Sequence, residues 1–494
     1  MKPRDWTAGH ARHLLWRAGF GGPPSQVAYL ARLSPEEAVA ALVDFDATPE
    51  HEPVRATTFE EWIMREPTAE ERRELMQARR AGNEDVLARA RLNREERERA
   101  DRAQIKRMQR WWLERMIETP RPLEEKLTLF WHGHFATSYR TIENSYHMFL
   151  QNQLLRRHAA GNFGDLLFGI IRDPAMLAYL DNNDSRAERP NENLARELME
   201  LFSLGQGHYA ERDIKEGARA LTGYTFEGNA FVFRRDWHDG GMKNLLGAAG
   251  PLDGDGFVRA ILEKKRTAEF IAGKLYRFFV SDAGDADPER GPAARAVIRG
   301  LASTLLAGRY ELKPVLRRLF LSEHFYDASN RFAHIKSPAE LIVGAARSLG
   351  APVRDLGIVC DAMDLMGQNI FFPPSVKGWD GGRSWINTST LYIRANIMNF
   401  LLTGRMPHGH DALAETQRLD PLPLVIGASE EEAHAEKDPQ KLAAFLMRFC
   451  FGFEPGKDKL AAVAELMRAR GGTTPEAITA ALSVIAAAPE YQLC

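Results

Sequence analysis

The sequence predicts a mainly α-helical protein, with a large multi-helix body, a charged helical arm, a short hairpin insert and long ordered loops. Apolar residues recur at helical spacing through most of the chain, and helix-capping residues precede several of these stretches. Only one short stretch alternates apolar and polar residues as a strand does. At 494 residues, 44% of them hydrophobic and 27% charged, the chain can bury a sizeable core.

Composition excludes several classes of function. The 65 Lys and Arg residues are balanced by 67 Asp and Glu residues, which argues against nucleic acid or an anionic membrane as a partner. Cys360, Cys450 and Cys494 are too far apart in sequence to suggest disulfides or a cysteine-based zinc site. No apolar run is long enough to span a membrane, and the N-terminus lacks the features of a signal peptide. We therefore expect a cytoplasmic protein.

The first two segments are predicted to be an N-terminal helical segment (1–66) and a charged helical arm (67–118). Ser34, followed by a Pro and a Glu, is a typical start of a helix in the first segment. Thr68 and Glu71 form a capping-box pattern at the start of the arm, in which Arg and Glu alternate. One continuous helix would span about 65 Å, so the Gly82-Asn83 pair favours two antiparallel helices instead. The end of the arm, with Trp111, Trp112 and Met116, is expected to pack on the body.

The remaining segments are predicted to be the main helical body with the candidate site (119–405), a linker (406–437) and a C-terminal helical module (438–494). Within the body, residues 226–256 are rich in Gly and alternate in polarity, which predicts the hairpin insert. Residues 366–388 contain two adjacent prolines and, among other residues, Gly378, Gly381 and Gly382, which predict a long loop.

A histidine pair is the first candidate for chemistry. His132 and His134 would point to one side if the chain were extended there, but on a continuous helix they would diverge. Gly133 between them favours a helix end, which would let both act as metal ligands; the alternative is two histidines packed by aromatic residues. With Asp181 and Glu192 they would form a mixed His and carboxylate site for a divalent metal ion.

A predicted helix from about Glu192 to Gly205 or Gly207 carries a polar stripe that includes Glu197. Leu194, Leu198 and Leu201 form the adjacent apolar stripe and are expected to be buried. Glu197 is expected to face a cleft and to act as a catalytic base, although a polar stripe beside an apolar one is also typical of an ordinary surface helix.

His238 and Asp239 precede a Gly-Gly turn and are further catalytic candidates, because an Asp beside a His can orient its imidazole. A turn stabilised by the aspartate would explain the same residues without a catalytic role.

The loop of residues 372–387 is a candidate ligand-binding segment with Trp379, Asp380, Arg383 and Trp385. Exposed indole faces beside short polar groups suit a sugar or another flat ligand; alternatively the tryptophans only anchor the loop. We expect one tryptophan to anchor the loop and the other to bind the ligand, with Trp379 buried and Trp385 nearer the cleft.

Several of these segments together resemble a bacterial family catalogued as domain of unknown function 1800. The resemblance covers about residues 10–400 and is carried by these strings: HLLWRAGFGGPPSQV, KLTLFWHGHFATS, NENLARELMELFSLG, HDGGMKNLLG, IKSPAELIVGAARSLG and PPSVKGWDGG. The family implies no known reaction. It implies a protein partner that resembles the alkaline-phosphatase and sulfatase fold, because genes of the two kinds are often neighbours. Those neighbours often look like substrates of twin-arginine export, so export as a passenger is the alternative to a cytoplasmic location.

Two functions are therefore considered. The first is a metal-assisted hydrolase whose metal activates a water molecule. The second is a non-catalytic binding or chaperone-like partner of the phosphatase-like protein, with the loop of residues 372–387 and the charged arm as its interface.

Overall fold

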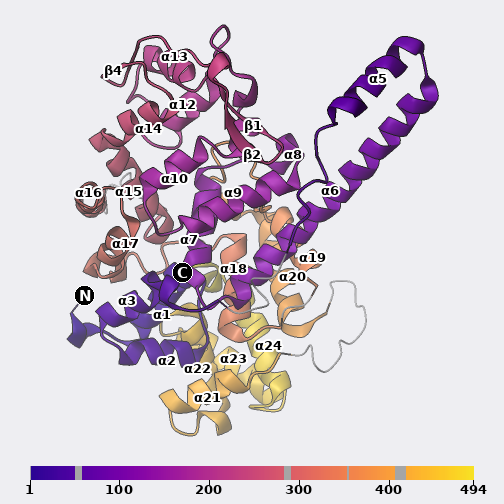
Figure 1. Ribbon diagram of the computed structural model, residues 1–494. Coiled ribbons are helices and arrows are strands. Elements are labelled where there is room, and N and C mark those ends of the chain that lie inside the picture. The colour runs from indigo at the N-terminus through magenta and orange to yellow at the C-terminus, as the bar shows by residue number, and fades with distance from the viewer. Residues whose placement is uncertain (1, 51–57, 283–290, 353–354, 406–418) are drawn as a thin grey trace.

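A computed structural model describes residues 2–50, 58–282, 291–352, 355–405 and 419–494 (Figure 1). These residues are mainly helical, with two small two-stranded antiparallel sheets, which confirms the predicted fold class. None of the helices in this part of the chain combines the length and apolar character that a membrane span requires.

The first half of the chain forms the N-terminal helices, the arm and the upper body in Figure 1. Its helices are α1 (Ala8–Gly19), α2 (Pro24–Arg32), α3 (Pro35–Val43), α5 (Ala69–Ala81), α6 (Glu84–Glu118), α7 (Pro122–His134), α8 (Tyr139–Ile142), α9 (Ser145–Arg157), α10 (Phe163–Ile170), α11 (Pro174–Tyr179), α12 (Asn193–Glu200) and α13 (Glu211–Ala220).

The second half begins with the hairpin insert and then returns to helices. The strands are β1 (Tyr224–Glu227), β2 (Ala230–Phe233), β3 (Lys243–Leu245) and β4 (Ala248–Gly250), paired β1 with β2 and β3 with β4. The helices are α14 (Gly254–Leu262), α15 (Lys265–Phe279), α16 (Gly291–Ala307), α17 (Leu312–Phe320), α18 (Pro338–Leu349), α19 (Leu356–Leu365), α20 (Thr388–Thr403), α21 (Leu422–Glu431), α22 (Pro439–Phe451), α23 (Lys457–Ala469) and α24 (Pro475–Ala487).

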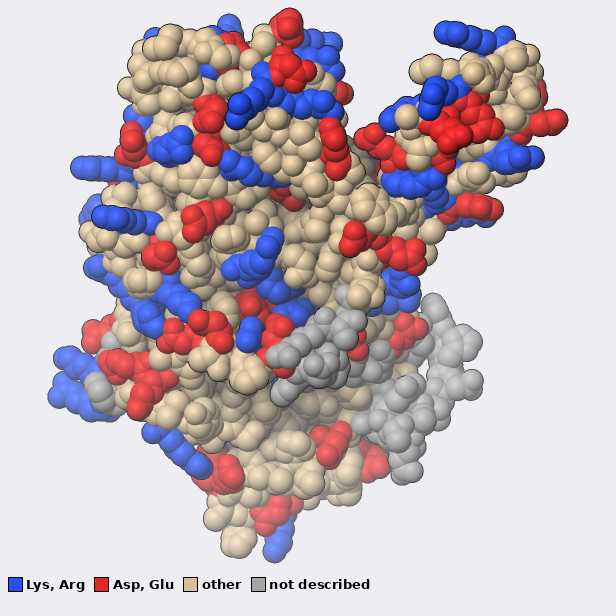
Figure 2. All heavy atoms as spheres, viewed as in Figure 1, with Lys and Arg blue, Asp and Glu red and all other residues tan. Residues whose placement is uncertain are grey.

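The arm is the antiparallel pair α5 and α6, which projects from the body (Figure 1). Thr68 and Glu71 form the predicted capping box, and Gly82 ends α5 in the left-handed conformation. The outer part of α6 is solvated, and Figure 2 shows acidic and basic side chains intermixed over the arm. Trp111 and Trp112, near the end of α6, are buried in the body as predicted.

Helix α7 lies at the centre of the body and is buried along nearly its whole length. Pro122 occupies its first turn, where the missing N–H costs nothing, and two glutamates follow in that turn. The helix continues through Gly133 and ends at His134, so both histidines of the pair belong to its last turn.

The C-terminal helices pack against the body. An isolated β-bridge joins Ile335 to Leu493, and the backbone N–H of Lys336 donates to the carbonyl of Gln492 at 2.8 Å. Helix α21 lies within the predicted linker, of which residues 406–418 are outside the described residues.

Candidate functional site

The tryptophan loop, residues 372–387, closes a cavity of about 240 Å³ over the end of α7. Parts of α15 and the first turn of α18 complete its walls. The larger apolar side chains that line it are Leu129, Phe130, Phe278, Trp379 and Trp385. The charged side chains and the histidines are His134, Lys274, Arg277, Asp282, His334, Glu340, Lys377 and Asp380. The cavity therefore combines indole and phenyl surface with an unusual density of charge.

Backbone contact holds the tryptophan loop against α7. Gly378 has a φ of +80°, and a Cβ atom there would overlap the carbonyl oxygen of Gly133. Only glycine fits this close approach. At the end of the loop, Asn387 caps α20 by accepting a hydrogen bond from the N–H of Thr390 at 2.9 Å.

The two tryptophans have the opposite exposures from those predicted. Trp385 is buried, with 6% of its surface exposed, whereas Trp379 is half-buried. Trp379 packs beside His132, with ring centroids 5.6 Å apart, and also lines the cavity. The prediction was wrong because spacing along a loop does not show which side chain the loop turns inward.

Replacing the two tryptophans separately should give different results. Trp385→Ala should lower the free energy of unfolding by about 3 kcal/mol, because it removes a large buried side chain. Trp379→Ala should cost under about 1.5 kcal/mol, since part of this side chain is already solvated. Thermal and urea unfolding of both variants measure this difference, and equal losses would contradict the assignment.

The other two predicted loop residues lie at the surface. Asp380 lines the cavity rim and pairs with Lys377 at 2.7 Å, with both side chains mostly exposed. Such an exposed pair contributes little to stability. Arg383 is exposed and does not line the cavity.

The histidine pair diverges, because α7 runs through Gly133 to its last residue. Nε2 of His132 accepts a hydrogen bond from the N–H of Phe371 at 3.0 Å, while Nε2 of His134 donates to the carbonyl of Phe202 at 3.0 Å. Burial lowers the pKa of each histidine to about 3, so both are neutral. The prediction that both face one side is wrong, and the alternative of packed histidines describes them.

The predicted carboxylate ligands do not join the histidines. Asp181 is exposed, and Glu192 pairs with Arg196 at 3.3 Å on α12. Nowhere in the described part of the chain do three His, Cys, Asp or Glu side chains gather in a group that could hold a metal ion. The described residues therefore do not support the predicted metal site.

Glu197 does not line the cavity. It is half-buried, and its pKa is raised by burial and by the charge of Glu200. Leu194 and Leu198, on the apolar face of the same helix, are fully buried as predicted, whereas Leu201 is only partly buried.

His238 and Asp239 also lie away from the cavity. Nδ1 of His238 donates to the carbonyl of Thr222 at 2.9 Å. Asp239 pairs with Arg219 at 2.6 Å and accepts from the N–H of Gly241 at 2.8 Å. These contacts stabilise the turn before β3, which is the structural alternative for this motif.

Sequence reasoning missed a buried charge cluster in the cavity wall. His334 lies 3.2 Å from a carboxylate oxygen of Asp282 and 3.3 Å from one of Glu340. The other oxygen of Glu340 pairs with the fully buried Lys126 at 2.6 Å. Burial opposes the charge on His334, but Glu340 and Asp282 outweigh it and raise its pKa to about 9. The Ser337–Glu340 capping box was the one visible signal, and it indicates only a helix start.

Two other cations in the wall were also missed. Lys274 and Arg277 lie one helical turn apart on α15, and neither has a carboxylate within ion-pair distance among the described residues. The pKa of Lys274 is lowered to about 8, because burial disfavours its charge and Arg277 and Lys377 add positive potential. An anion at this wall would relieve that repulsion.

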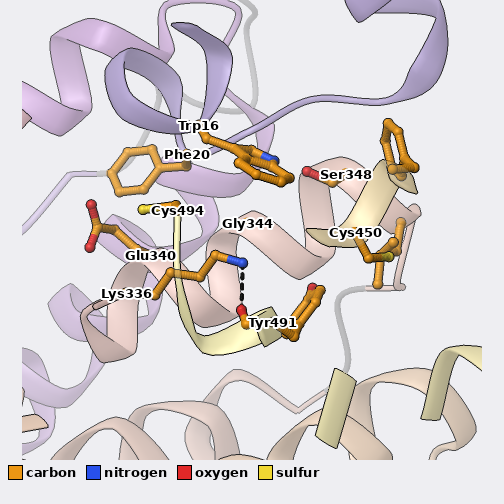
Figure 3. A pocket seen from close by; sticks show the side chains of 11 residues that line it. Trp16, Phe20, Lys336, Glu340, Gly344, Ser348, Cys450, Tyr491 and Cys494 are labelled. Carbon is orange, nitrogen blue, oxygen red and sulfur yellow. Dashed lines mark hydrogen bonds between the residues drawn. The ribbon is translucent and has the colours of Figure 1, made fainter. Parts of the chain in front are cut away.

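A second, much smaller cavity of about 20 Å³ lies between α1, α18 and the C-terminal segment (Figure 3). Its volume suits a single water molecule. Nζ of Lys336 donates to the carbonyl of Tyr491 at 2.7 Å, and the ammonium lies 4.1 Å from the centre of the Tyr491 ring. These contacts hold the C-terminal segment against the residues just before α18.

Comparison with known proteins places the chain in a family. No curated protein and no solved structure matches it. The family model described as "Protein of unknown function (DUF1800)" matches residues 13–493, nearly the whole chain. The predicted resemblance is thereby confirmed, and the chain belongs to the DUF1800 family.

Proposed function

We propose that this protein binds a small organic anion with a flat apolar part in the cavity beneath the tryptophan loop. The observation that carries the proposal is the pair Lys274 and Arg277, which face a partly apolar cavity without a carboxylate partner among the described residues. A partly buried cation without a counter-ion is costly, and a bound anion would compensate it.

The other charges of the wall compensate one another. Lys377 pairs with Asp380, and His334 lies between two carboxylates. Among the described residues of the wall, Lys274 and Arg277 are therefore the cations that can bind a carboxylate or phosphate. The indole of Trp379 offers a surface for the apolar part of the ligand.

Benzoate and its neutral isostere benzamide are suitable probes. Calorimetric titration should show benzoate binding at least about tenfold more tightly, because only benzoate carries the charge that Lys274 and Arg277 would bind. Equal affinities for the two compounds would contradict the proposal.

Lys274→Met should weaken benzoate binding by about tenfold to a hundredfold, which corresponds to one charge-assisted hydrogen bond. Lys215→Met, a surface change on α13, is the matched control and should leave the affinity unchanged.

The pH dependence gives a separate prediction. The pKa of Lys274 is lowered to about 8, so in the unliganded protein its charged form decreases as the pH rises through that value. Benzoate stays ionised throughout, so its affinity should fall by up to about tenfold per pH unit between pH 8 and 10. Lys274→Arg keeps the charge and should remove the part of this decline that Lys274 causes, while the smaller effect of His334, whose pKa is about 9, remains. An unchanged pH profile in that variant would assign the titration to another group.

A further inference from the structure

A second depression, the basic groove, lies beside the cavity between α15 and α16. Its volume is about 360 Å³, and the charged residues that line it are Arg266, Glu269, Lys274, Arg277, Arg295 and Arg299. Five of these six side chains are cationic, in a chain whose net charge is only -2. Figure 2 shows several Lys and Arg side chains along the edge of the molecule formed by these helices.

Helical spacing produces the groove. Arg266, Phe270 and Lys274 follow one another at four-residue intervals on α15, and Arg295 and Arg299 have the same interval on α16. Each set therefore lies on one face of its helix, and both faces line the groove.

Among the described residues, few carboxylates lie near Arg266, Arg277 and Arg299. Glu269 pairs with Arg266 at 3.5 Å. In the described part of the chain, Arg277 and Arg299 have no carboxylate within ion-pair distance. The lining is partly apolar, with Phe270 and Ile298, and these side chains do not compete for the hydrogen bonds of the guanidinium groups.

The basic groove and the cavity are adjacent, because Lys274 and Arg277 line both. We propose that the ligand also carries an extended polyanionic part with the charge density of an oligophosphate, with one anionic group at Lys274 and Arg277 and a further group at Arg299. This inference rests on the proposed anion site and extends it beyond the cavity. Arginine suits this role because its fork of donors binds phosphate oxygens in pairs.

Inorganic phosphate and tripolyphosphate are the probes. Tripolyphosphate should bind the intact protein at least about tenfold more tightly than phosphate, since it can reach both sets of cations. Arg299→Ala should remove most of this advantage and leave benzoate binding unchanged, because Arg299 does not line the cavity. Arg235→Ala, an exposed arginine outside both depressions, is the matched control and should change neither affinity.

A second variant separates a defined site from diffuse attraction between charges. Gly273 lines the basic groove, and a Cβ atom there would meet no atom within 4 Å. Gly273→Phe should therefore be tolerated within α15 and should fill the groove with every cation in place. Tripolyphosphate affinity should fall to that of phosphate.

The inference would be overturned if tripolyphosphate bound no more tightly than phosphate. It would also be overturned if neither Arg299→Ala nor Gly273→Phe changed the affinity for tripolyphosphate. Benzoate affinity in the same variants reports on the cavity alone. Suppose that Lys274→Met weakens benzoate binding but Arg299→Ala does not change the affinity for tripolyphosphate. This result would support the proposed anion site in the cavity and contradict the inference that the ligand extends into the basic groove.

Discussion

Glu125→Gln is expected to lower the free energy of unfolding by about 3 to 5 kcal/mol, the largest effect of any single substitution considered. Glu125 is fully buried on α7. It pairs with Arg115 at 2.5 Å and with Arg156 at 2.7 Å, and it accepts a hydrogen bond from the indole N–H of Trp112 at 2.8 Å. An amide would take the carboxylate partner away from the buried Arg156 and would leave Arg115 with only its other carboxylate contacts, such as Glu50. A broken buried pair costs this much.

Glu124 provides an independent check on that cluster. Burial and the neighbouring charge of Glu125 raise the pKa of Glu124 to about 7. In the Glu125→Gln variant the like charge is gone, so the pKa of Glu124 should fall. Carboxyl NMR titration measures this shift, and an unchanged value would show that burial alone determines it.

The surface of the arm supplies the matched control. Glu98 pairs with Arg94 at 2.8 Å, and the Arg94 side chain is 74% exposed. Glu98→Gln should cost no more than about 0.5 kcal/mol, because solvent screens such pairs. Comparable losses at Glu98 and Glu125 would contradict the role of burial.

His334→Gln is expected to lower the free energy of unfolding by about 3 kcal/mol at pH 6, and this loss should depend on pH. Glu340 and Asp282 outweigh the effect of burial and raise the pKa of His334 from 6.5 to about 9. The folded state therefore holds this proton more tightly than the unfolded chain does. The resulting stabilisation is fully present below about pH 6.5 and is lost as the pH rises through about 9. A shift of this size corresponds to about 3 kcal/mol.

Urea unfolding of the wild type and His334→Gln, compared at each pH, measures this contribution. The difference should be about 3 kcal/mol at pH 6 and under about 1 kcal/mol at pH 9. Taking the difference removes groups common to both proteins, such as Lys336, whose pKa burial lowers to about 8. A difference that is constant across this range would mean that His334 contributes through packing and not through its charge.

Local signals in the sequence were sufficient for the fold class, the arm and several helix starts. A capping box such as Thr68 with Glu71 involves residues three positions apart, and Gly82 ends its helix through its own backbone freedom. The leucines on the face of α12 follow helical periodicity, which is also a local property.

The predicted site was wrong where the direction of side chains depended on whether a helix ends or continues. Gly133 suggested that the helix ends between the two histidines and lets both point to one side, but α7 continues through Gly133 and ends at His134. Residues two positions apart then point to different parts of the core, because successive helical residues are rotated by about 100°. The sequence also does not specify the direction of side chains in the tryptophan loop, so the predicted exposures of Trp379 and Trp385 were the reverse of those in the structure.

By itself, the sequence determined the helical architecture and the family, because periodicity, caps and long motifs are properties of neighbouring residues. The cavity and its charges were decided only by the tertiary structure. Lys126, Asp282, His334 and Glu340 meet from distant parts of the chain, and Lys274 acquires its lowered pKa from burial and from cations brought beside it. Burial and through-space charge depend on how helices pack, and no spacing along a single chain specifies them.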